Sequence, residues 1–133
     1  MIEITVPFPP SDNSHKKLGG FTRSKTGNLV QLRVNTNETK QFFFDVYVLI
    51  KQMKATQGVK SFGSAPIYLE VDVYPPDNRK RDITNILKVL NDSLERGGLF
   101  DDDYQISRLL IQRCGIVDQG KVVVRIYEVS KCI

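Results

Sequence analysis

Residues that bind zinc are scarce in this sequence of 133 residues. It has one histidine, His15, and two cysteines, Cys114 and Cys132, which lack C-x-x-C spacing. This composition excludes a Cys/His zinc cluster, which needs several such ligands at short spacings. The same cysteine usage favours a reduced, cytoplasmic setting over a disulfide-stabilised one.

Long apolar segments and export signals are missing as well. No hydrophobic run reaches the roughly 18 residues that a membrane-spanning helix needs. The N-terminal stretch MIEITVPFPP has an acid at position 3 and prolines at 7, 9 and 10, which excludes a signal peptide. Because repeats, low-complexity tracts and linkers are also missing, residues 1–133 are expected to form a single domain.

Positive charge is concentrated in the first half of the chain. Residues 1–60 hold nine Lys or Arg against four Asp or Glu, whereas residues 61–133 hold ten against eleven. A basic half suits a polyanionic partner. Acids gathered in the other half suit a metal site or acid–base chemistry.

Apolar periodicity indicates the order of helices and strands. Alternation predicts strands at 2–6, 67–74, 105–112 and 122–129, with a further short strand at 29–34. Helical spacing predicts helices at 39–54 and 83–96, the second with Asp82 as its N-cap and closed by Gly97 and Gly98. This order predicts an α+β domain with a mixed β-sheet and two main helices.

The polar stretch 11–37 is interpreted mostly as a long loop. It contains the cations Lys16, Lys17, Arg23 and Lys25. Two interpretations stay open: the cations contact phosphates, or they belong to a solvated, mobile loop.

The stretch RKRDITNILK, residues 79–88, sets three cations directly before Asp82 and places Lys88 about two helical turns later. An aspartate at this point is most simply a helix cap. However, cations keep a neighbouring carboxylate ionised, as a metal ligand must be. A helix N-terminus also binds anions, so the stretch equally fits a site for phosphate and a metal ion.

Three adjacent acids, Asp101, Asp102 and Asp103, follow the second helix. They repel one another unless solvent or a cation offsets their charge, and a solvated acidic turn is the simplest interpretation. If they lie beside Asp82 in space, the acids form an oxygen site of the kind that Mg²⁺ prefers. Phosphodiester hydrolysis uses such a site.

The segment PPDNRKRDITNILKVLNDSLERGGLFDDDYQI, residues 75–106, resembles the core of the RusA family of Holliday junction resolvases. That family shows a basic run into Arg-Asp-x-Asp-Asn, then Lys, Asp and Leu on one helix, then a Gly-aromatic segment and Asp-Asp-x-Gln-hydrophobic. The matching residues are Arg81, Asp82, Asn85, Lys88, Asp92, Leu94, Gly98, Asp102, Asp103, Gln105 and Ile106. The stretch PFPPSDN, residues 7–13, is similar to the family's Pro-aromatic-Pro-Pro-Ser opening.

The resemblance implies a homodimeric, Mg²⁺-dependent endonuclease, with Mn²⁺ as a substitute, that resolves four-way DNA junctions by symmetric paired nicks in recombination and repair. By position it implies Asp82, Lys88 and Asp103 as catalytic residues. Asp82 and Asp103 would be metal ligands, with Asp102 as a neighbour or additional ligand. The cations Arg79, Lys80 and Arg81 would contact DNA.

One position departs from the family motif, because Thr84 stands where the second aspartate is expected. Three interpretations stay open: Thr84 ligates through its hydroxyl, Asp101 or Asp102 takes the vacant place, or the protein binds junctions and cuts them slowly or not at all. An RNA-binding module is a further alternative. It has only basic charge and aromatics in its favour, without an RRM or KH signature.

A dimer also has a physical rationale. A four-way junction offers two equivalent strands, which two sites related by a two-fold axis would suit. The helix at 39–54 carries Phe44, Tyr47 and Val48 beside its main apolar stripe. This surplus fits either a subunit contact or deep burial.

Overall fold

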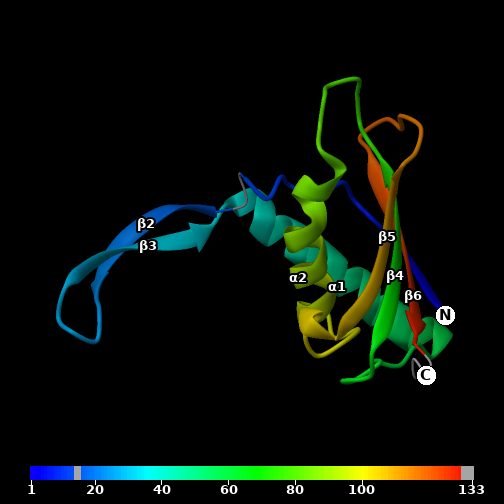
Figure 1. The fold of residues 1–133 in the computed structure, drawn as a ribbon, viewed down its shortest axis with the longest axis horizontal. Helices are drawn as coiled ribbons and strands as arrows, with labels where there is room; N and C mark the ends of the chain where they lie inside the picture. Colours follow the sequence, from blue (N-terminus) through cyan, green and yellow to red (C-terminus); the bar gives the residue numbers. More distant parts are fainter. Residues whose placement is uncertain (14–15, 130–133) are drawn as a thin grey trace.

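The computed structural model of the chain describes residues 1–13 and 16–129, with the side chains at positions 16, 17, 20 and 30–34 left undescribed. Its elements (Figure 1) are β1 (Ile2–Val6), β2 (Lys16–Arg23), β3 (Leu29–Asn35), α1 (Asn37–Gln57), β4 (Ile67–Tyr74), the 3₁₀ turn η1 (Ile83–Ile86), α2 (Leu87–Arg96), the 3₁₀ turn η2 (Asp103–Gln105), β5 (Ile106–Arg113) and β6 (Lys121–Glu128). Within this described part, no helix has the length and apolar character needed to cross a membrane.

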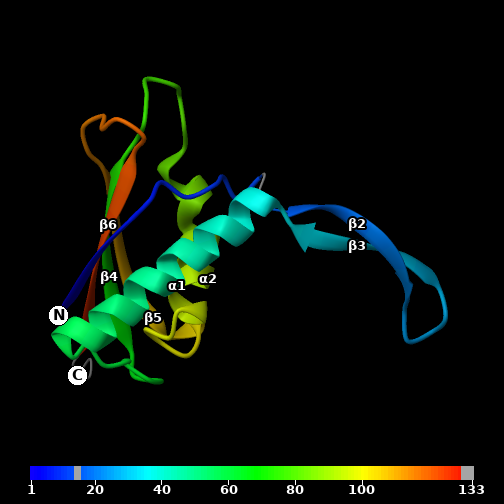
Figure 2. The ribbon, with the colours of Figure 1, turned by 180° about the vertical axis from the view of Figure 1, so that it is seen from behind.

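Four strands form one mixed sheet in the order β1-β6-β4-β5. Strand β6 pairs antiparallel with β1 and β4, whereas β5 runs parallel to β4. A parallel pair needs a crossover connection, and η1, α2 and η2 provide it. Figures 1 and 2 show both helices on the same side of the sheet. The predicted α+β class with a mixed sheet and two main helices is confirmed.

The core lies between this sheet and the two helices. Alternation along β4 buries Ile67, Leu69, Val71 and Val73, each at most 2% exposed, as the two-residue period of a strand requires. The helices contribute Phe42, Val46, Ile50, Val89, Leu90 and Leu94. Each such side chain stabilises the fold by about 1.5–3 kcal/mol, so packing fixes where the polar face of α2 lies.

Helices α1 and α2 approach each other closely at Gly97. A Cβ at this position would overlap with the end of the Ile50 side chain, so a larger residue would force the Ile50 side chain or one of the two helices to shift. The next residue, Gly98, has φ +87°, the left-handed conformation in which helices often end. The predicted end of the second helix at these glycines is confirmed.

The second helical segment begins at Ile83 as predicted, with Asp82 in the N-cap position, but its first turn is a 3₁₀ helix and the predicted side-chain cap by Asp82 is wrong. The chain after Asp82 forms the 3₁₀ turn η1, α2 begins at Leu87, and Asp82 makes no side-chain capping hydrogen bond. The first turn of α2 is capped instead by a distant residue, Asp12, whose carboxylate accepts hydrogen bonds from the backbone N–H groups of Lys88 and Val89. Asp82 lies too many residues before α2 for its short side chain to serve this helix.

The predicted long loop is also wrong over most of its length. Strands β2 and β3 pair antiparallel and project from the body as an arm (Figures 1 and 2); the short strand expected at 29–34 is confirmed as β3. We call residues 16–35 the arm. The ladder shifts register between Leu18 and Phe21, at a bulge that contains Gly19 and Gly20. This bulge interrupts the alternation, which is why β2 could not be recognised from periodicity.

Helix α1 is longer than the predicted 39–54 at both ends. Thr36 caps it, because its Oγ1 accepts a hydrogen bond from the backbone N–H of Thr39 at 3.2 Å. Gly58, with φ +65°, closes it in the left-handed conformation. A threonine N-cap and a left-handed glycine C-cap are common helix ends, and α1 extends from one to the other.

Candidate active site

Three carboxylates meet where α2 ends and η2 begins. Oxygens of Glu95, Asp102 and Asp103 all lie within 4.8 Å of one another. Glu95 comes from the last turn of α2, and the two aspartates lead into η2. We call these three residues the acidic cluster. Sequence analysis expected Asp102 and Asp103 at a metal site but did not include Glu95.

Gln105 fixes the backbone of the acidic cluster. Its side-chain Oε1 accepts hydrogen bonds from the N–H groups of Asp101 and Asp102, at 3.0 and 2.9 Å. Its Nε2 donates to the carbonyl oxygens of Gly63 and Ala65, at 2.8 and 2.6 Å. Because Gln105 is only 8% exposed, this network anchors the acidic segment to the loop before β4.

Further hydrogen bonds orient the carboxylates themselves. Asp102 caps η2, since its Oδ1 accepts from the Tyr104 N–H at 2.8 Å. Glu95 Oε1 accepts from the Asp103 N–H at 3.1 Å. The acidic cluster is therefore a set of positioned side chains rather than a freely solvated turn.

Negative charge is crowded at Asp103. Its pKa lies above the ordinary value, first because of a hydrogen bond with Asp102, then because of burial and the charges of Asp102 and Asp92. The ammonium of Lys88 acts in the opposite direction, and it lies 3.9 Å from the Asp92 carboxylate. Lys88 thus pairs with Asp92 and exerts an electrostatic influence on Asp103.

The donor set of the acidic cluster fits a small divalent cation. Carboxylate oxygens are the ligands that Mg²⁺ prefers, at about 2.0–2.1 Å, so two oxygens on one ion lie roughly 3–4 Å apart. The observed limit of 4.8 Å is slightly wider, and small side-chain rotations would close the difference. A cation would also offset the repulsion among the three acids.

Asp82 does not belong to the acidic cluster. It is exposed and precedes η1, whereas Glu95 lies in the last turn of α2. Glu95 follows Asp82 by thirteen positions of mostly helical chain, or about 20 Å along the axis at the usual rises. Asp82 and the acidic cluster therefore lie at opposite ends of the crossover segment. Thr84 is exposed within η1, at the same end as Asp82.

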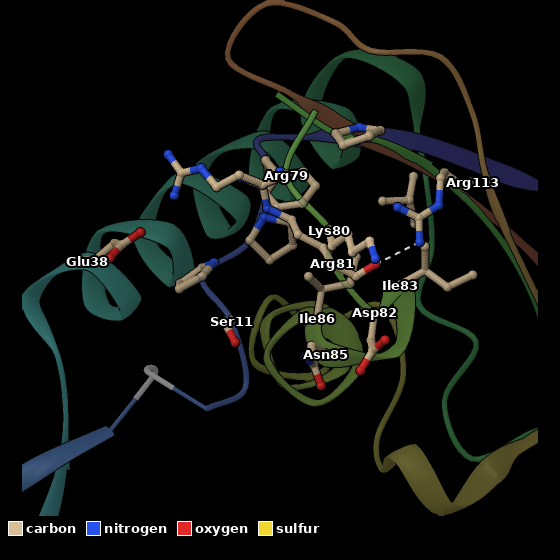
Figure 3. Close-up of a pocket in the computed structure, with 15 residues that line it drawn as sticks. Ser11, Glu38, Arg79, Lys80, Arg81, Asp82, Ile83, Asn85, Ile86 and Arg113 are labelled. Atoms are coloured by element: carbon tan, nitrogen blue, oxygen red, sulfur yellow. Dashed lines mark hydrogen bonds between the residues drawn. The ribbon is translucent and has the colours of Figure 1, made fainter. Parts of the chain in front are cut away.

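Around Asp82 the chain forms a pocket of about 830 Å³. The residues that line it include Ser11, Arg79, Lys80, Arg81, Asn85 and Arg113 (Figure 3). Figure 3 shows the side-chain oxygens of Asp82, Asn85 and Ser11 on one side, and the Arg79 guanidinium on the other. The three cations before Asp82 thus line a concave surface with a net positive charge.

Arg81 is already bound to a carboxylate. Its Nη1 and Nη2 donate to the Asp77 carboxylate at 2.6 and 3.1 Å, and its guanidinium stacks over the Phe8 ring at 5.7 Å. Hydrogen bonds from Arg81 and from the backbone N–H of Arg79 lower the pKa of Asp77 to about 2. Arg79 and Lys80 are more exposed than Arg81.

The cations expected in the polar loop lie on the arm. Lys16 and Lys17 begin β2, and their side chains lie outside the described part of the structure. Arg23 ends β2 and donates to the Gly27 carbonyl at 2.9 Å, while Lys25 is exposed in the turn. The arm as a whole carries five Lys or Arg and no Asp or Glu.

Two residues of this region were missed by sequence analysis. Glu95 follows Lys88 by seven residues, so both fall on one face of the helix, and this spacing was a usable signal. Asp12 had no comparable signal, because it meets α2 only through the fold.

Known proteins match almost the whole chain. The family model described as endodeoxyribonuclease RusA matches residues 7–127. A protein of Enterobacteria phage HK97, named crossover junction endodeoxyribonuclease rusA, is 28% identical over 128 residues, which cover 96% of this chain and 95% of that protein.

Two further relatives carry the same name. The protein of Escherichia coli strain K12 and that of Enterobacteria phage 82 are each 26% identical over 128 residues, covering 96% of this chain and 94% of theirs. The matched region includes both the Asp82 pocket and the acidic cluster. The chain belongs to the RusA endodeoxyribonuclease family.

Proposed function

We propose that this protein is a Mg²⁺-dependent endonuclease that resolves four-way DNA junctions by paired nicks, in recombination and repair. The observation that carries the proposal is the acidic cluster beside Lys88, in a chain of the RusA family. The relatives named crossover junction endodeoxyribonucleases support the choice of a branched DNA substrate.

Each side chain of the cluster has a role in this proposal. Asp102, Asp103 and Glu95 would hold Mg²⁺, for which Mn²⁺ would substitute. When bound there, such an ion would supply a Lewis acid for a phosphoryl oxygen and hydroxide near neutral pH. Lys88 offsets the charge that grows on the scissile phosphate.

A homodimer reconciles the position of Asp82 with its assigned role. One ion cannot contact both Asp82 and Asp103 of the same chain if about 20 Å separates the two ends of the crossover segment. A two-fold axis next to α2 would bring Asp82 of one copy to the acidic cluster of the other. Phe44 and Tyr47, which are 60% and 43% exposed on α1, support an apolar contact between copies.

The arm is the segment proposed to bind the DNA backbone. The chain has nineteen Lys or Arg and fifteen Asp or Glu, and five of those cations but none of the acids lie in the arm. The rest of the chain thus has a net charge of −1. Phosphate contacts of Lys16, Lys17, Arg23 and Lys25, together with Arg79, Lys80 and Arg81, would neutralise the backbone on both sides of the branch point.

The first test compares a labelled four-way junction with a linear duplex, in Mg²⁺ and in EDTA. We expect paired nicks in the junction alone, with Mg²⁺ required. Asp82→Asn should abolish cleavage and keep or improve binding, because it removes a negative charge near phosphate. Cleavage that survives in Asp82→Asn would show that this residue is not part of the active site.

A second candidate is a junction-binding protein with little or no nuclease activity, which Thr84 favours. It predicts tight, salt-sensitive binding without a Mg²⁺-dependent product. Cutting that appears only after Thr84→Asp would support this second function over the first.

A further inference from the structure

We propose that the arm carries a base-stacking site, in which Phe21 stacks on a DNA base exposed at the branch point. The inference rests on the proposed function only in that the substrate is branched DNA. It goes beyond the phosphate contacts proposed for the arm, because phosphate contacts need cations alone. The apolar side chains of the arm need a different partner.

The arm exposes large apolar side chains that the body of the protein leaves uncovered. Leu18, Phe21 and Leu29 are 60%, 63% and 64% exposed. Figures 1 and 2 show the arm extending away from the sheet and from both helices. Single exposed apolar residues are common, but a two-stranded ribbon lacks a core of its own and is at best marginally stable alone in water. An arm that presents three such side chains is therefore expected to acquire a partner.

Phe21, Arg23 and Leu29 lie on one face of the arm, which we call the stacking face. Arg23 is the cross-strand partner of Leu29, and directly opposite residues share a face of the ribbon. Phe21 precedes Arg23 by two residues, so it belongs to the same face. Arg23 Nη1 donates to the Gly27 carbonyl at 2.9 Å, and the Gly27 N–H donates to the Ser24 carbonyl at 2.9 Å. These bonds hold the end of the arm in a defined turn, with a cation close to the aromatic ring.

The charge of the arm favours DNA as the partner. The arm has five Lys or Arg and no Asp or Glu, so the arms of two copies would repel each other, whereas a polyanion would be attracted. At roughly 3.3 Å per residue, the eight residues of β2 span about 26 Å. A major groove is about 8.5 Å deep and admits a two-stranded β-ribbon. The arm is thus long enough to reach past the phosphates to the bases.

A base face is the part of DNA that best matches an aromatic ring. In a continuous duplex each base face is covered by the next base pair, and a side chain in a groove meets only base edges. At a branch point the continuous stack is interrupted, so a base face becomes accessible. Aromatic side chains stack on such bases whatever the sequence, while nearby cations bind the backbone. The stacking face would therefore distinguish a junction from a duplex, which phosphate contacts do not do by themselves.

The test compares binding to a four-way junction and to a linear duplex by fluorescence anisotropy, in EDTA so that no strand is cut. We expect Phe21→Ala to weaken junction binding by about five- to 150-fold, the usual effect of losing one stacked base, and to leave duplex binding almost unchanged. Phe21→Trp keeps a planar ring and should bind as the wild type does. Phe21→Leu keeps an apolar side chain without a ring and should resemble Phe21→Ala. Thr22→Ala, on the opposite face of the arm, is the matched control and should change neither affinity.

A junction with 2-aminopurine beside the branch point provides a second measurement. This base analogue fluoresces more strongly when it no longer stacks on neighbouring bases. The wild type and Phe21→Trp should therefore raise its fluorescence, whereas Phe21→Ala and Phe21→Leu should not. The same analogue placed within one of the four duplexes should respond to none of these proteins.

The stacking site would be overturned by wild-type junction binding in Phe21→Ala or Phe21→Leu, or by equal losses on junction and duplex. A lower mass of Phe21→Ala in light scattering without DNA would mean that the arm contacts a second copy, and would overturn it as well. A wild type without preference for the junction has no such site. A wild type that binds the junction and raises the fluorescence, yet cuts nothing in Mg²⁺, would instead overturn the proposed nuclease function and support the stacking site.

Discussion

Asp12 caps the helix that carries Lys88. Its Oδ2 accepts a hydrogen bond from the Lys88 backbone N–H at 3.2 Å, across a separation of 76 residues, and its Oδ1 accepts from Val89 at 3.1 Å. These bonds satisfy two of the N–H groups that a helix start leaves without partners. They also leave the side chain of Asp82, the nearest acid that precedes the helix in the sequence, without a capping role.

Replacing Asp12 should weaken α2 at its start. Asp12→Ala should lower the free energy of unfolding by about 0.5–2 kcal/mol, the usual value of an N-cap, and slow cleavage because Lys88 loses a fixed backbone position. Asp12→Asn keeps an acceptor and should retain most of both. Urea unfolding and single-turnover cleavage measure the two effects. Thr36→Ala removes the cap of α1 and should destabilise the fold comparably without slowing cleavage.

This cap also shows where prediction from sequence stopped. The strands with strict alternation, such as Ile67–Tyr74, and the end of the second helix at Gly97 were predicted correctly, because local patterns determine them. The cap by Asp12 depends on a contact between distant segments, which no local pattern encodes. The hairpin was missed because the Gly19–Gly20 bulge interrupts its period.

The candidate site was likewise predicted from the sequence only in part. Family motif and residue spacing named Asp102, Asp103 and Lys88, which the structure brings near one another. The predicted helix at 83–96 already implied that Asp82 and the acids at 101–103 lie at its opposite ends, but the family motif assigns them to one metal site, which a single chain does not bring together.

The ion pair between buried Asp72 and half-buried Arg125 should make stability depend on pH. Hydrogen bonds from Arg125 and Gln112, at 2.9 and 2.7 Å, lower the pKa of Asp72. Because the folded pKa lies below the unfolded value of about 3.9, the pair stabilises the protein fully above that pH. The stabilisation is lost as pH falls through the folded pKa.

Asp72→Asn should therefore lower the free energy of unfolding by about 1.5–3 kcal/mol at pH 7, the usual range for a hydrogen bond to a charged group. The difference from wild type should shrink as pH falls below about 4. Urea unfolding at pH 7, 5 and 3 measures this. A difference that stays constant over this range would mean that the charge of Asp72 is not what stabilises the fold.

Releasing Arg81 should strengthen DNA binding. Asp77 now holds its guanidinium through two hydrogen bonds, and Arg79 Nε lies 3.5 Å from the same carboxylate. Asp77→Asn removes the competing anion, so we expect tighter binding and a salt dependence steeper by about one phosphate contact. Fluorescence anisotropy over a range of salt concentrations measures both. Asp118→Asn, in the exposed turn before β6, is the control. Weaker binding by Asp77→Asn would mean that Asp77 orients Arg81 toward DNA.

The arm should contribute affinity without sequence preference. Lys25→Ala, at the exposed turn of the arm, should weaken binding to junction and duplex by similar factors and reduce the salt slope by about 1. Lys60→Ala removes an exposed lysine outside the arm and should change neither. A Lys25→Ala protein with the wild-type salt slope would show that the turn of the arm does not contact phosphate.

Mixing two inactive variants should restore cleavage if the dimer completes the site. In a mixed dimer of Asp82→Asn and Asp103→Asn, one site would combine both altered residues, and the other would combine the intact Asp82 and Asp103. That second site should cut, producing single nicks in the junction from two preparations that are each inactive alone. If Asp82 and Asp103 act within one chain, both sites of the mixed dimer keep one altered residue, and the mixture stays inactive. Light scattering before the assay tests whether dimers form. An affinity tag on one variant alone tests whether the copies have exchanged, because the untagged variant should then be purified together with the tagged one.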